Sequence, residues 1–434
     1  MKILIENIDI ITCDYNSEDI IKNAFLGIEG GYISFISRTK NEEFKPDYVI
    51  NGKNKILMPG LVNAHTHCAM TILRNCADDV SLHEWLFNNI FPAEAKMEPE
   101  DVYWGSLLGI AEMIKSGTTT FADMYLHMDE VARAVSDTGI RANLSKSPWK
   151  FDASKKRLAN QMSDCFEYYK KWNNSANGRI KVSVEIHSVY LFDEESLCSS
   201  AQIAKELDAR IHIHMLETLR EREESIEKYG MSPVEICLKT GVLDVPVIAA
   251  HCVHLSKKDI EIIKEKGVNV VHNPSSNLKL GSGIARVPEL LSKGINVSLG
   301  TDGAASNNNL NIIEEIHLTA MIHKGVNMDP TCINAYECLK MATVNSSKAL
   351  GLEREIGYIK EGMKADVILF DMNKTHICPI NNPISAIAYC VQGSDVDTVI
   401  IDGNIVMEKG QLTTIDEEKV KYEVKRISKK IFNL

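Results

Sequence analysis

The chain has 434 residues, of which 44% are hydrophobic and 25% are charged, with 25 Gly and 12 Pro. This composition is typical of an ordinary globular protein with a sizeable core, and it excludes fibrous and intrinsically disordered chains. The formal net charge of −11, from 48 Lys and Arg against 59 Asp and Glu, argues against nucleic acid or an anionic membrane surface as a partner.

The N-terminal residues do not resemble a targeting segment. Glu6 and Asp9 interrupt the apolar stretch that a secretory signal needs, and no run approaches the ~18 apolar residues of a membrane span. The 11 cysteines are an odd number and form no C-x-x-C pair, so reduced thiols are expected rather than a disulfide framework. These features predict a cytoplasmic protein.

Both ends of the chain predict short β-strands. The expected strands share β-branched and aromatic residues, with turn residues between them: residues 3–5, 25–28, 32–36, 365–370, 396–401 and 405–407. Gly30-Gly31 and Asp402-Gly403 are hairpin signals within these groups. We expect residues 1–56 and 353–434 to form one small β-sandwich domain.

Residues 57–352 predict an α/β fold, a (β/α)8 TIM-like barrel. Short apolar strands alternate there with amphipathic, helix-like stretches, for example at residues 211–215, 247–250, 268–271 and 296–299. A span of roughly 300 residues is within the range of an eight-stranded barrel with insertions.

Polar residues of metal-ligand type follow several of the expected barrel strands. His65 and His67 form an H-x-H pair after an apolar strand, and His214, His251 and Asp302 follow three others. Side chains alternate along a strand, so His65 and His67 should face the same way. The carboxyl ends of barrel strands meet at one face, where these groups could bind one divalent, zinc-like ion.

The alternative for each polar residue is an ordinary hydrogen-bonded core position. An H-x-H pair alone is weak support for a metal site, but several buried polar groups without partners would cost ~1–3 kcal/mol each. His212 shares the inward face with His214 one layer deeper. We expect His212 to be a hydrogen-bonded core residue.

The segment MPGLVNAHTH at residues 58–67 resembles the first-strand signature of the amidohydrolase superfamily. Further segments along nearly the whole chain are similar to the 5′-methylthioadenosine/S-adenosylhomocysteine deaminases: WL (85–86), PAEA (92–95), HIHMLET (212–218), AHC (250–252), HNPSSNLK (272–279), GTDGAASNNN (300–309) and EGMKAD (361–366). The resemblance implies a hydrolase that acts on the C–N bonds of cyclic amidines and converts a purine nucleoside, a small-molecule substrate, by removing the 6-amino group of an adenosine derivative as ammonia.

Position by position, the resemblance implies that His65, His67, His214 and Asp302 bind one divalent metal ion per subunit, with Zn²⁺ expected first. Three neutral imidazoles and one carboxylate leave such an ion a net charge near +1 and an open position for water, whose pKa falls to ~7. An N₃O site also binds Fe, Co or Mn, so the sequence does not settle the metal.

The resemblance also implies three catalytic residues, Glu217, His251 and Asp302. Asp302 accepts a proton from the attacking water, Glu217 gives a proton to a ring nitrogen, and His251 orients the attacking oxygen; Glu217 and Asp302 thereby also contact the substrate. Glu217 could instead be a solvated carboxylate at a helix start. His251 could bind a second metal, but residues 182–186 lead to His187 rather than to a bridging carboxylate, which favours one ion.

Further substrate contacts are implied at Glu94, His187 and Ser306, which match positions that recognise the purine nucleoside. A carboxylate such as Glu94 can accept hydrogen bonds from both hydroxyls of a ribose, although a surface glutamate is the alternative. Trp85 is a candidate wall of the pocket or a core tryptophan.

Lys146 departs from the family pattern, which usually has Arg at this position. A lysine keeps the charge but lacks the planar fork that binds a carboxylate through two parallel hydrogen bonds. We therefore expect methylthioadenosine or adenosine, rather than S-adenosylhomocysteine, to be favoured. Substitute cations are available nearby at Lys150, Lys155, Lys156 and Arg157.

Two other functions compete with this interpretation. The same metal site could serve another heterocycle of the guanine, cytosine, aminodeoxyfutalosine or triazine type, because barrel loops change substrate readily. A non-catalytic scaffold on this barrel would be expected to lose ligands, whereas all of them are present here. The sequence leaves open whether the chain forms a homo-oligomer.

Overall fold

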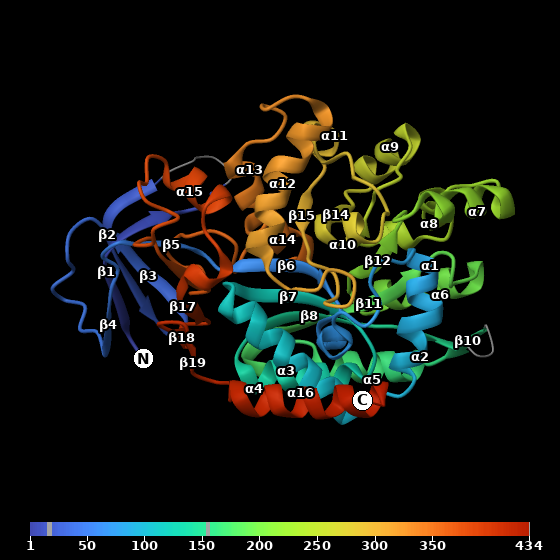
Figure 1. Cartoon of the computed structure of the whole chain (residues 1–434), viewed down its shortest axis with the longest axis horizontal. Coiled ribbons are helices and arrows are strands. Elements are labelled where there is room, and N and C mark those ends of the chain that lie inside the picture. Colours follow the sequence, from blue (N-terminus) through green and yellow to red (C-terminus); the bar gives the residue numbers. More distant parts are fainter. Residues whose placement is uncertain (15–19, 153–156, 434) are drawn as a thin grey trace.

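Strands from both ends of the chain form one nine-stranded sheet. The computed structural model describes residues 1–14, 20–152 and 157–433, and the sheet has the order β19-β18-β17-β16-β5-β1-β2-β3, with β4 beside β1 (Figure 1). The strands are β1 (Ile3–Ile11), β2 (Ile20–Glu29), β3 (Tyr32–Ser37), β4 (Tyr48–Asn51), β5 (Lys55–Pro59), β16 (Val367–Asp371), β17 (Val396–Ile401), β18 (Asn404–Glu408) and β19 (Gln411–Leu412).

Both hairpin signals in this sheet are confirmed. Gly30 and Gly31 have φ of 61° and 87° between β2 and β3, and Asp402 and Gly403 have φ of 50° and 73° between β17 and β18. Two consecutive positive φ values match the twist of the flanking strands, which is why Gly and Asp occur there.

The sheet has one face of its own and one face against the barrel. Along β16, Val367 and Leu369 belong to the cluster inside the sheet domain, whereas Ile368 and Phe370 belong to the large core shared with the barrel. Because side chains alternate along a strand, one face of the sheet packs against the barrel and the other forms its own core.

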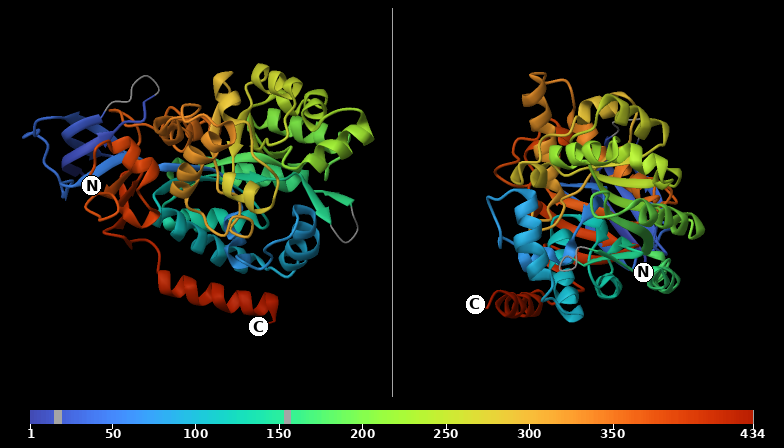
Figure 2. Two further views of the ribbon diagram at one scale, coloured as in Figure 1. Left: turned by 45° about the horizontal axis from the view of Figure 1, so that its top comes forward. Right: turned by 90° about the vertical axis from the view of Figure 1, so that its right-hand side faces the viewer.

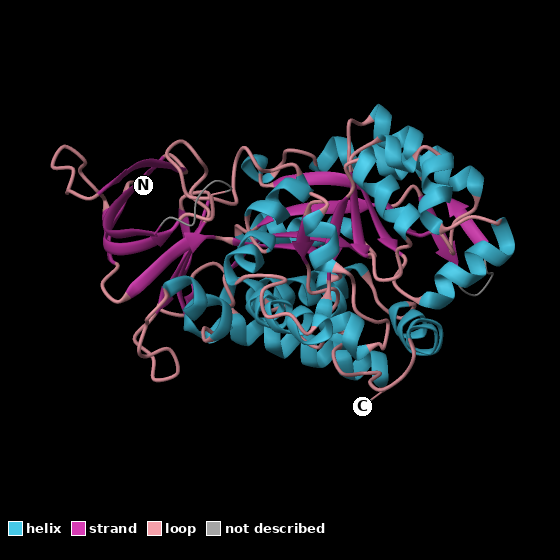
Figure 3. Ribbon diagram, turned by 90° about the horizontal axis from the view of Figure 1, so that it is seen from above, coloured by secondary structure: helices cyan, strands magenta, loops and turns pink. Residues whose placement is uncertain are grey.

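The middle of the chain forms the predicted barrel. Its eight parallel strands have the order β15-β14-β13-β12-β11-β8-β7-β6, surrounded by helices (Figure 3). They are β6 (Leu61–Thr66), β7 (Thr118–Met124), β8 (Arg141–Lys146), β11 (Ile180–Ser188), β12 (Ile211–Met215), β13 (Val247–His251), β14 (Asn269–His272) and β15 (Val297–Leu299). The first and last strands meet where Asp302 N–H donates to the carbonyl of His65 at 3.0 Å.

Most helices lie between or after the barrel strands along the chain. They are α3 (Pro99–Lys115), α4 (Met128–Thr138), α5 (Met162–Trp172), α6 (Glu194–Glu206), α7 (Leu219–Tyr229), α8 (Pro233–Lys239), α9 (Lys257–Glu265), α10 (Pro274–Lys279), α11 (Val287–Ser292), α12 (Ile312–Asn327), α13 (Ala335–Met341), α14 (Val344–Leu350) and α15 (Pro383–Tyr389). No helix in the described part of the chain is long and apolar enough to cross a membrane.

Short elements fill two long connections. After β6 come η1 (Cys68–Leu73), α1 (Leu82–Glu84), η2 (Trp85–Ile90) and α2 (Phe91–Glu94); after β8, β9 (Trp149–Asp152) pairs with β10 (Arg157–Asn160). Both connections leave the carboxyl ends of barrel strands, the end at which the polar residues were expected.

The passage from sheet to barrel differs in detail from the sequence prediction. The apolar run at 56–62 is two strands, β5 in the sheet and β6 in the barrel, joined at Gly60. A Cβ at Gly60 would lie 2.0 Å from Thr119 Oγ1, so only glycine fits this crossing. The predicted domain boundary after residue 56 lies within β5.

The last helix, α16 (Glu417–Phe432), returns to the barrel and lies beside α3 (Figures 1 and 2). Lys115 on α3 contacts Glu417 at 2.9 Å. Residues 353–434 therefore contribute to both regions of the molecule.

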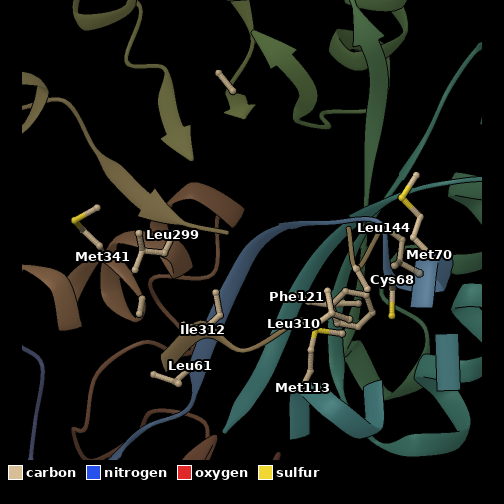
Figure 4. Close-up of a cluster of buried hydrophobic side chains, with 14 of the residues drawn as sticks. Leu61, Cys68, Met70, Met113, Phe121, Leu144, Leu299, Leu310, Ile312 and Met341 are labelled. Atoms are coloured by element: carbon tan, nitrogen blue, oxygen red, sulfur yellow. The ribbon is translucent and has the colours of Figure 1, made fainter. Parts of the chain in front are cut away.

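Apolar side chains form a large core between the barrel strands and the helices, and a smaller cluster, the apolar plug, inside the barrel. Phe121 on β7 and Met113 on α3 belong to the core outside the barrel (Figure 4). Inside it, Val62, Ile248 and Val271 form a separate buried cluster with their neighbours. This plug leaves the carboxyl ends of the strands to polar side chains.

Candidate metal-dependent active site

Four of the predicted residues converge at the carboxyl end of the barrel. His65, His67, His214 and Asp302 each offer one ligand atom, and these atoms lie within 4.8 Å of one another. All four side chains are buried. His65 lies on β6 and His67 directly after it; His214 lies on β12, and Asp302 follows β15.

Hydrogen bonds fix the orientation of two of these imidazoles. His67 Nδ1 lies 2.6 Å from the carbonyl of Met124, and His214 Nδ1 lies 2.7 Å from the carbonyl of His187. A carbonyl only accepts, so both Nδ1 atoms carry the proton and each neutral ring leaves Nε2 bare. The two Nε2 atoms face each other at 3.2 Å, an unfavourable contact of two acceptors that a cation between them would relieve.

The third imidazole is oriented by a buried chain of side chains. His65 Nδ1 lies 2.9 Å from His212 Nε2, and His212 Nδ1 lies 3.1 Å from Ser145 Oγ. His212 is thus the hydrogen-bonded core residue that was predicted. Burial lowers the pKa of His65 to about 4, and its Nε2 has no hydrogen-bond partner among the described residues.

Asp302 completes the donor set. Its Oδ1 lies 3.4 Å from His65 Nε2 and 3.3 Å from His67 Nε2, while its Oδ2 accepts from Ser276 at 2.6 Å and from Ser306 at 2.9 Å. Burial acts to raise the pKa of Asp302, but His65 and the other imidazoles hold it well below its usual value. The structure thus places Ser306 against Asp302; its role as a substrate contact stays a prediction.

The geometry fits one small divalent ion. Ligand atoms ~2.0–2.1 Å from a tetrahedral Zn²⁺ lie about 3.3 Å apart, as do the facing atoms of His67, His214 and Asp302. The orphaned His65 Nε2 points to the same fit. Three imidazoles and a carboxylate are a donor set that zinc binds commonly.

Glu217 and His251 lie beside the cluster and are held by other side chains. Glu217 Oε1 accepts from Ser282 at 3.0 Å, and Glu217 Oε2 lies 3.7 Å from His251 Nε2. Burial raises the pKa of Glu217. Burial acts to lower the pKa of His251, but the carboxylates of Glu217 and Asp302 raise it overall.

Three residues around the site have an unusual backbone conformation. Leu216, His251 and Asp302 have φ of 49°, 73° and 62°, a region that side chains larger than glycine rarely adopt. Such strain is concentrated at functional sites. Here it occurs beside the ligand cluster.

Three of the predicted substrate contacts, His187, Glu94 and Trp85, have different surroundings in the structure. The His187 ring lies 4.7 Å from the His214 ring, which brings it to the cluster. Glu94 on α2 is 9% exposed, and burial raises its pKa to about 7 despite a hydrogen bond from Tyr125. Trp85 is buried, and its indole N–H has no partner in the described part of the chain.

Lys146 is not brought to the cluster. It pairs in register with Val184, which packs in the core outside the barrel, and its ammonium lies 5.9 Å from the ring centre of Tyr168 on α5. Burial raises the pKa of Glu185, and the charge of Lys146 acts to lower it, so Lys146 is within electrostatic reach of this end of the barrel; its contact with the substrate tail stays a prediction. Of the substitute cations, Lys155 and Lys156 lie outside the described residues.

Glu185 and Tyr190 are among the residues near the site that the sequence analysis missed. Glu185 pairs with the inward-facing His212, and burial raises its pKa to about 8; alternation with His187 along β11 could have identified it. Tyr190 is 42% exposed, with its ring 6.5 Å from the His187 ring. It follows the strand, where alternation gives no signal.

The chain is similar to known proteins over almost its whole length. The model of the amidohydrolase family matches residues 56–406. A 5-methylthioadenosine/S-adenosylhomocysteine deaminase of Acetivibrio thermocellus is 66% identical over 433 residues, 99% of this chain and 100% of that protein. A protein of the same name from Thermoanaerobacter pseudethanolicus is 49% identical, over 99% of each chain.

Solved structures share the whole fold. An adenosine deaminase from Xanthomonas campestris with bound zinc superposes with a TM-score of 0.94 at 30% identity, over 100% of this chain and 99% of that one. A triazine hydrolase from Arthrobacter aurescens superposes with a TM-score of 0.91 at 23% identity, over 98% of this chain and 99% of that one, a likeness of fold alone.

Proposed function

The chain belongs to the amidohydrolase family, and we propose that it removes the 6-amino group of a 5′-substituted adenosine by hydrolysis, giving the inosine derivative and ammonia. The observation that carries this proposal is the buried cluster of four ligand atoms within 4.8 Å, with Glu217 and His251 beside it. The relative that is 66% identical over the full chain supports the substrate class.

We propose that His65, His67, His214 and Asp302 hold one Zn²⁺ ion per subunit. When bound, such an ion lowers the pKa of a water molecule to ~7 and so supplies hydroxide at neutral pH. The protein contributes the orientation of the imidazoles, because each Nδ1 is committed to another partner and each Nε2 faces the centre.

Three residues act on the attacking water or on the substrate ring in this proposal. The carboxylate of Asp302, which Ser276 and Ser306 hold in place through Oδ2, accepts the proton of the attacking water. His251 Nε2 stabilises the attacking oxygen, helped by carboxylates that favour its charged form. Glu217 Oε2 gives its proton to the ring nitrogen, since burial raises the Glu217 pKa and keeps more of it protonated.

We propose Glu94, His187 and Trp85 as the walls of the nucleoside pocket. Glu94 can accept from both ribose hydroxyls, and His187 adjoins the reacting end through His214. All 11 cysteines are free thiols, which supports a cytoplasmic location.

The test is a measurement of metal content and ammonia release on the purified protein. We expect about one metal ion per chain and release from 5′-methylthioadenosine, adenosine or S-adenosylhomocysteine. The same assay on guanine, cytosine, aminodeoxyfutalosine and a triazine measures the competing substrates. Ammonia from one of these alone, or a chain that binds no metal, would contradict the proposal.

A further inference from the structure

One segment after β14 contacts all three proposed catalytic residues. Ser276 donates to Asp302 at 2.6 Å, Asn277 accepts from His251 Nδ1 at 2.8 Å, and Ser282 donates to Glu217 at 3.0 Å. These contacts come from α10 and the loop that follows it.

We propose that Asn277 and Ser282 are positioning residues, which hold His251 and Glu217 in the orientation that deamination requires. The inference rests on the proposed function, because it assigns these residues to the same site.

Ser282 is itself held rigidly. Its N–H donates to the carbonyl of Asn277 at 2.8 Å, and its carbonyl lies 2.7 Å from His254 Nε2. Gly281 and Gly283 on either side have φ of 67° and 118°, so the loop takes a turn that larger residues avoid. Because the main chain of Ser282 is held on both sides, its hydroxyl keeps a fixed position and can hold the carboxylate oxygen of Glu217 in place.

The contact with Ser282 determines which oxygen of Glu217 is free. Oε1 accepts the serine hydroxyl, and Oε2 is the oxygen nearer His251, at 3.7 Å. The main chain of Glu217 is held separately, since its N–H donates to the carboxylate of Glu221 at 2.9 Å. Loss of the serine hydroxyl therefore releases the carboxylate without releasing the turn that carries it.

Asn277 does the same for the imidazole. Its Oδ1 accepts from His251 Nδ1, which fixes the ring plane and turns Nε2 toward Glu217. His251 is 1% exposed and has φ of 73°, so its side chain has little other freedom. One short segment thus sets the relative position of the proton donor and the group that stabilises the attacking oxygen.

The test compares Ser282→Ala and Asn277→Ala with wild type, with 5′-methylthioadenosine as substrate and with metal content and melting temperature measured for each protein. We expect kcat to fall ~10–100-fold while KM stays within about twofold, because a misplaced catalytic group weakens the chemical step more than binding. Ser282→Thr keeps the hydroxyl and should recover most of the rate. Ser292→Ala, which removes an exposed hydroxyl bonded only to a carbonyl on α11, is the matched control.

A double-mutant cycle separates positioning from general damage. In a Glu217→Gln background, Ser282→Ala should cause little further loss of kcat, because the group that it positions is already disabled. Three results would overturn the inference. They are full additivity of the two losses of kcat, an unchanged kcat in both single variants, and a loss of kcat that follows the metal content or the melting temperature. If the wild type does not deaminate the nucleoside, the proposed function fails as well; an active wild type with unaffected variants refutes only the positioning roles.

Discussion

Buried charged groups occur at both ends of the barrel, and the two sets are completed differently. At the amino end, the guanidinium of Arg141 donates to both oxygens of Asp366 at 2.9 and 3.0 Å, with each side chain 1% exposed. The N–H of Asp402 donates to the same carboxylate at 2.8 Å. At the carboxyl end, His65 Nε2 has no hydrogen-bond partner among the described residues, and two other Nε2 atoms face each other.

The difference indicates what each set does. The Arg141–Asp366 pair joins the first residue of β8 to the residue before β16, so it connects the barrel to the sheet. The two charges neutralise each other and form hydrogen bonds without a further ion. The histidine cluster is complete only with a cation. Loss of the Arg141–Asp366 pair should therefore lower the free energy of unfolding, and loss of a cluster histidine should lower metal content and activity.

The largest expected effect is on the cluster. His67→Ala or Asp302→Asn should reduce turnover to background and lower metal content, because the first removes one of four ligand atoms and the second replaces the charged carboxylate with a neutral amide. The fold should remain, since the apolar plug and the helices do not depend on these side chains. Circular dichroism, metal analysis and ammonia release measure the three outcomes; wild-type turnover in either variant would show that the metal assignment is wrong.

Glu217→Gln should separate binding from chemistry. We expect metal content and substrate affinity close to wild type, with kcat lower by ~10²–10⁴-fold, the usual contribution of general acid–base catalysis. The amide keeps the shape and an acceptor for Ser282 but cannot give the proton. A variant that lost its metal would make Glu217 a ligand instead.

At the amino end, Arg141→Met should lower the free energy of unfolding by ~3–5 kcal/mol, because Asp366 is left charged and buried without its partner. Metal content and kcat of the folded fraction should be unchanged. Arg133→Met is the control, since Arg133 pairs with Glu100 on the surface, where a pair contributes ~0–1 kcal/mol. Urea denaturation measures both; equal effects would contradict the comparison of the two ends.

Local patterns predicted those features that depend on one strand or one turn. The strand at 211–215 was placed with its observed bounds, since alternation and β-branched residues define it. Both hairpins followed from residues that accept positive φ. Convergence of polar residues at one face was expected because the carboxyl ends of barrel strands meet, whereas the choice of four ligands among them came from the family resemblance.

Features that depend on contacts between distant residues were not predicted. The division of residues 56–62 at Gly60 depends on Thr119, and the placement of α16 depends on α3. Ser282 was not singled out because nothing near it in sequence shows that its hydroxyl meets Glu217, 65 positions away. The direction of Lys146 depends likewise on packing with Tyr168.

The smallest expected effect concerns Lys146 and the choice of substrate. We expect the wild type to show weak or reversed preference for S-adenosylhomocysteine over methylthioadenosine, because a lysine turned toward Tyr168 gives the carboxylate tail at most a point charge. Lys146→Arg should raise kcat/KM for S-adenosylhomocysteine about tenfold, as part of a charged hydrogen bond of ~1.5–3 kcal/mol is gained. Methylthioadenosine, which has no carboxylate, is the internal control and should be unaffected. A wild type that strongly prefers S-adenosylhomocysteine, together with an Arg variant that gains nothing, would show that another residue binds the tail.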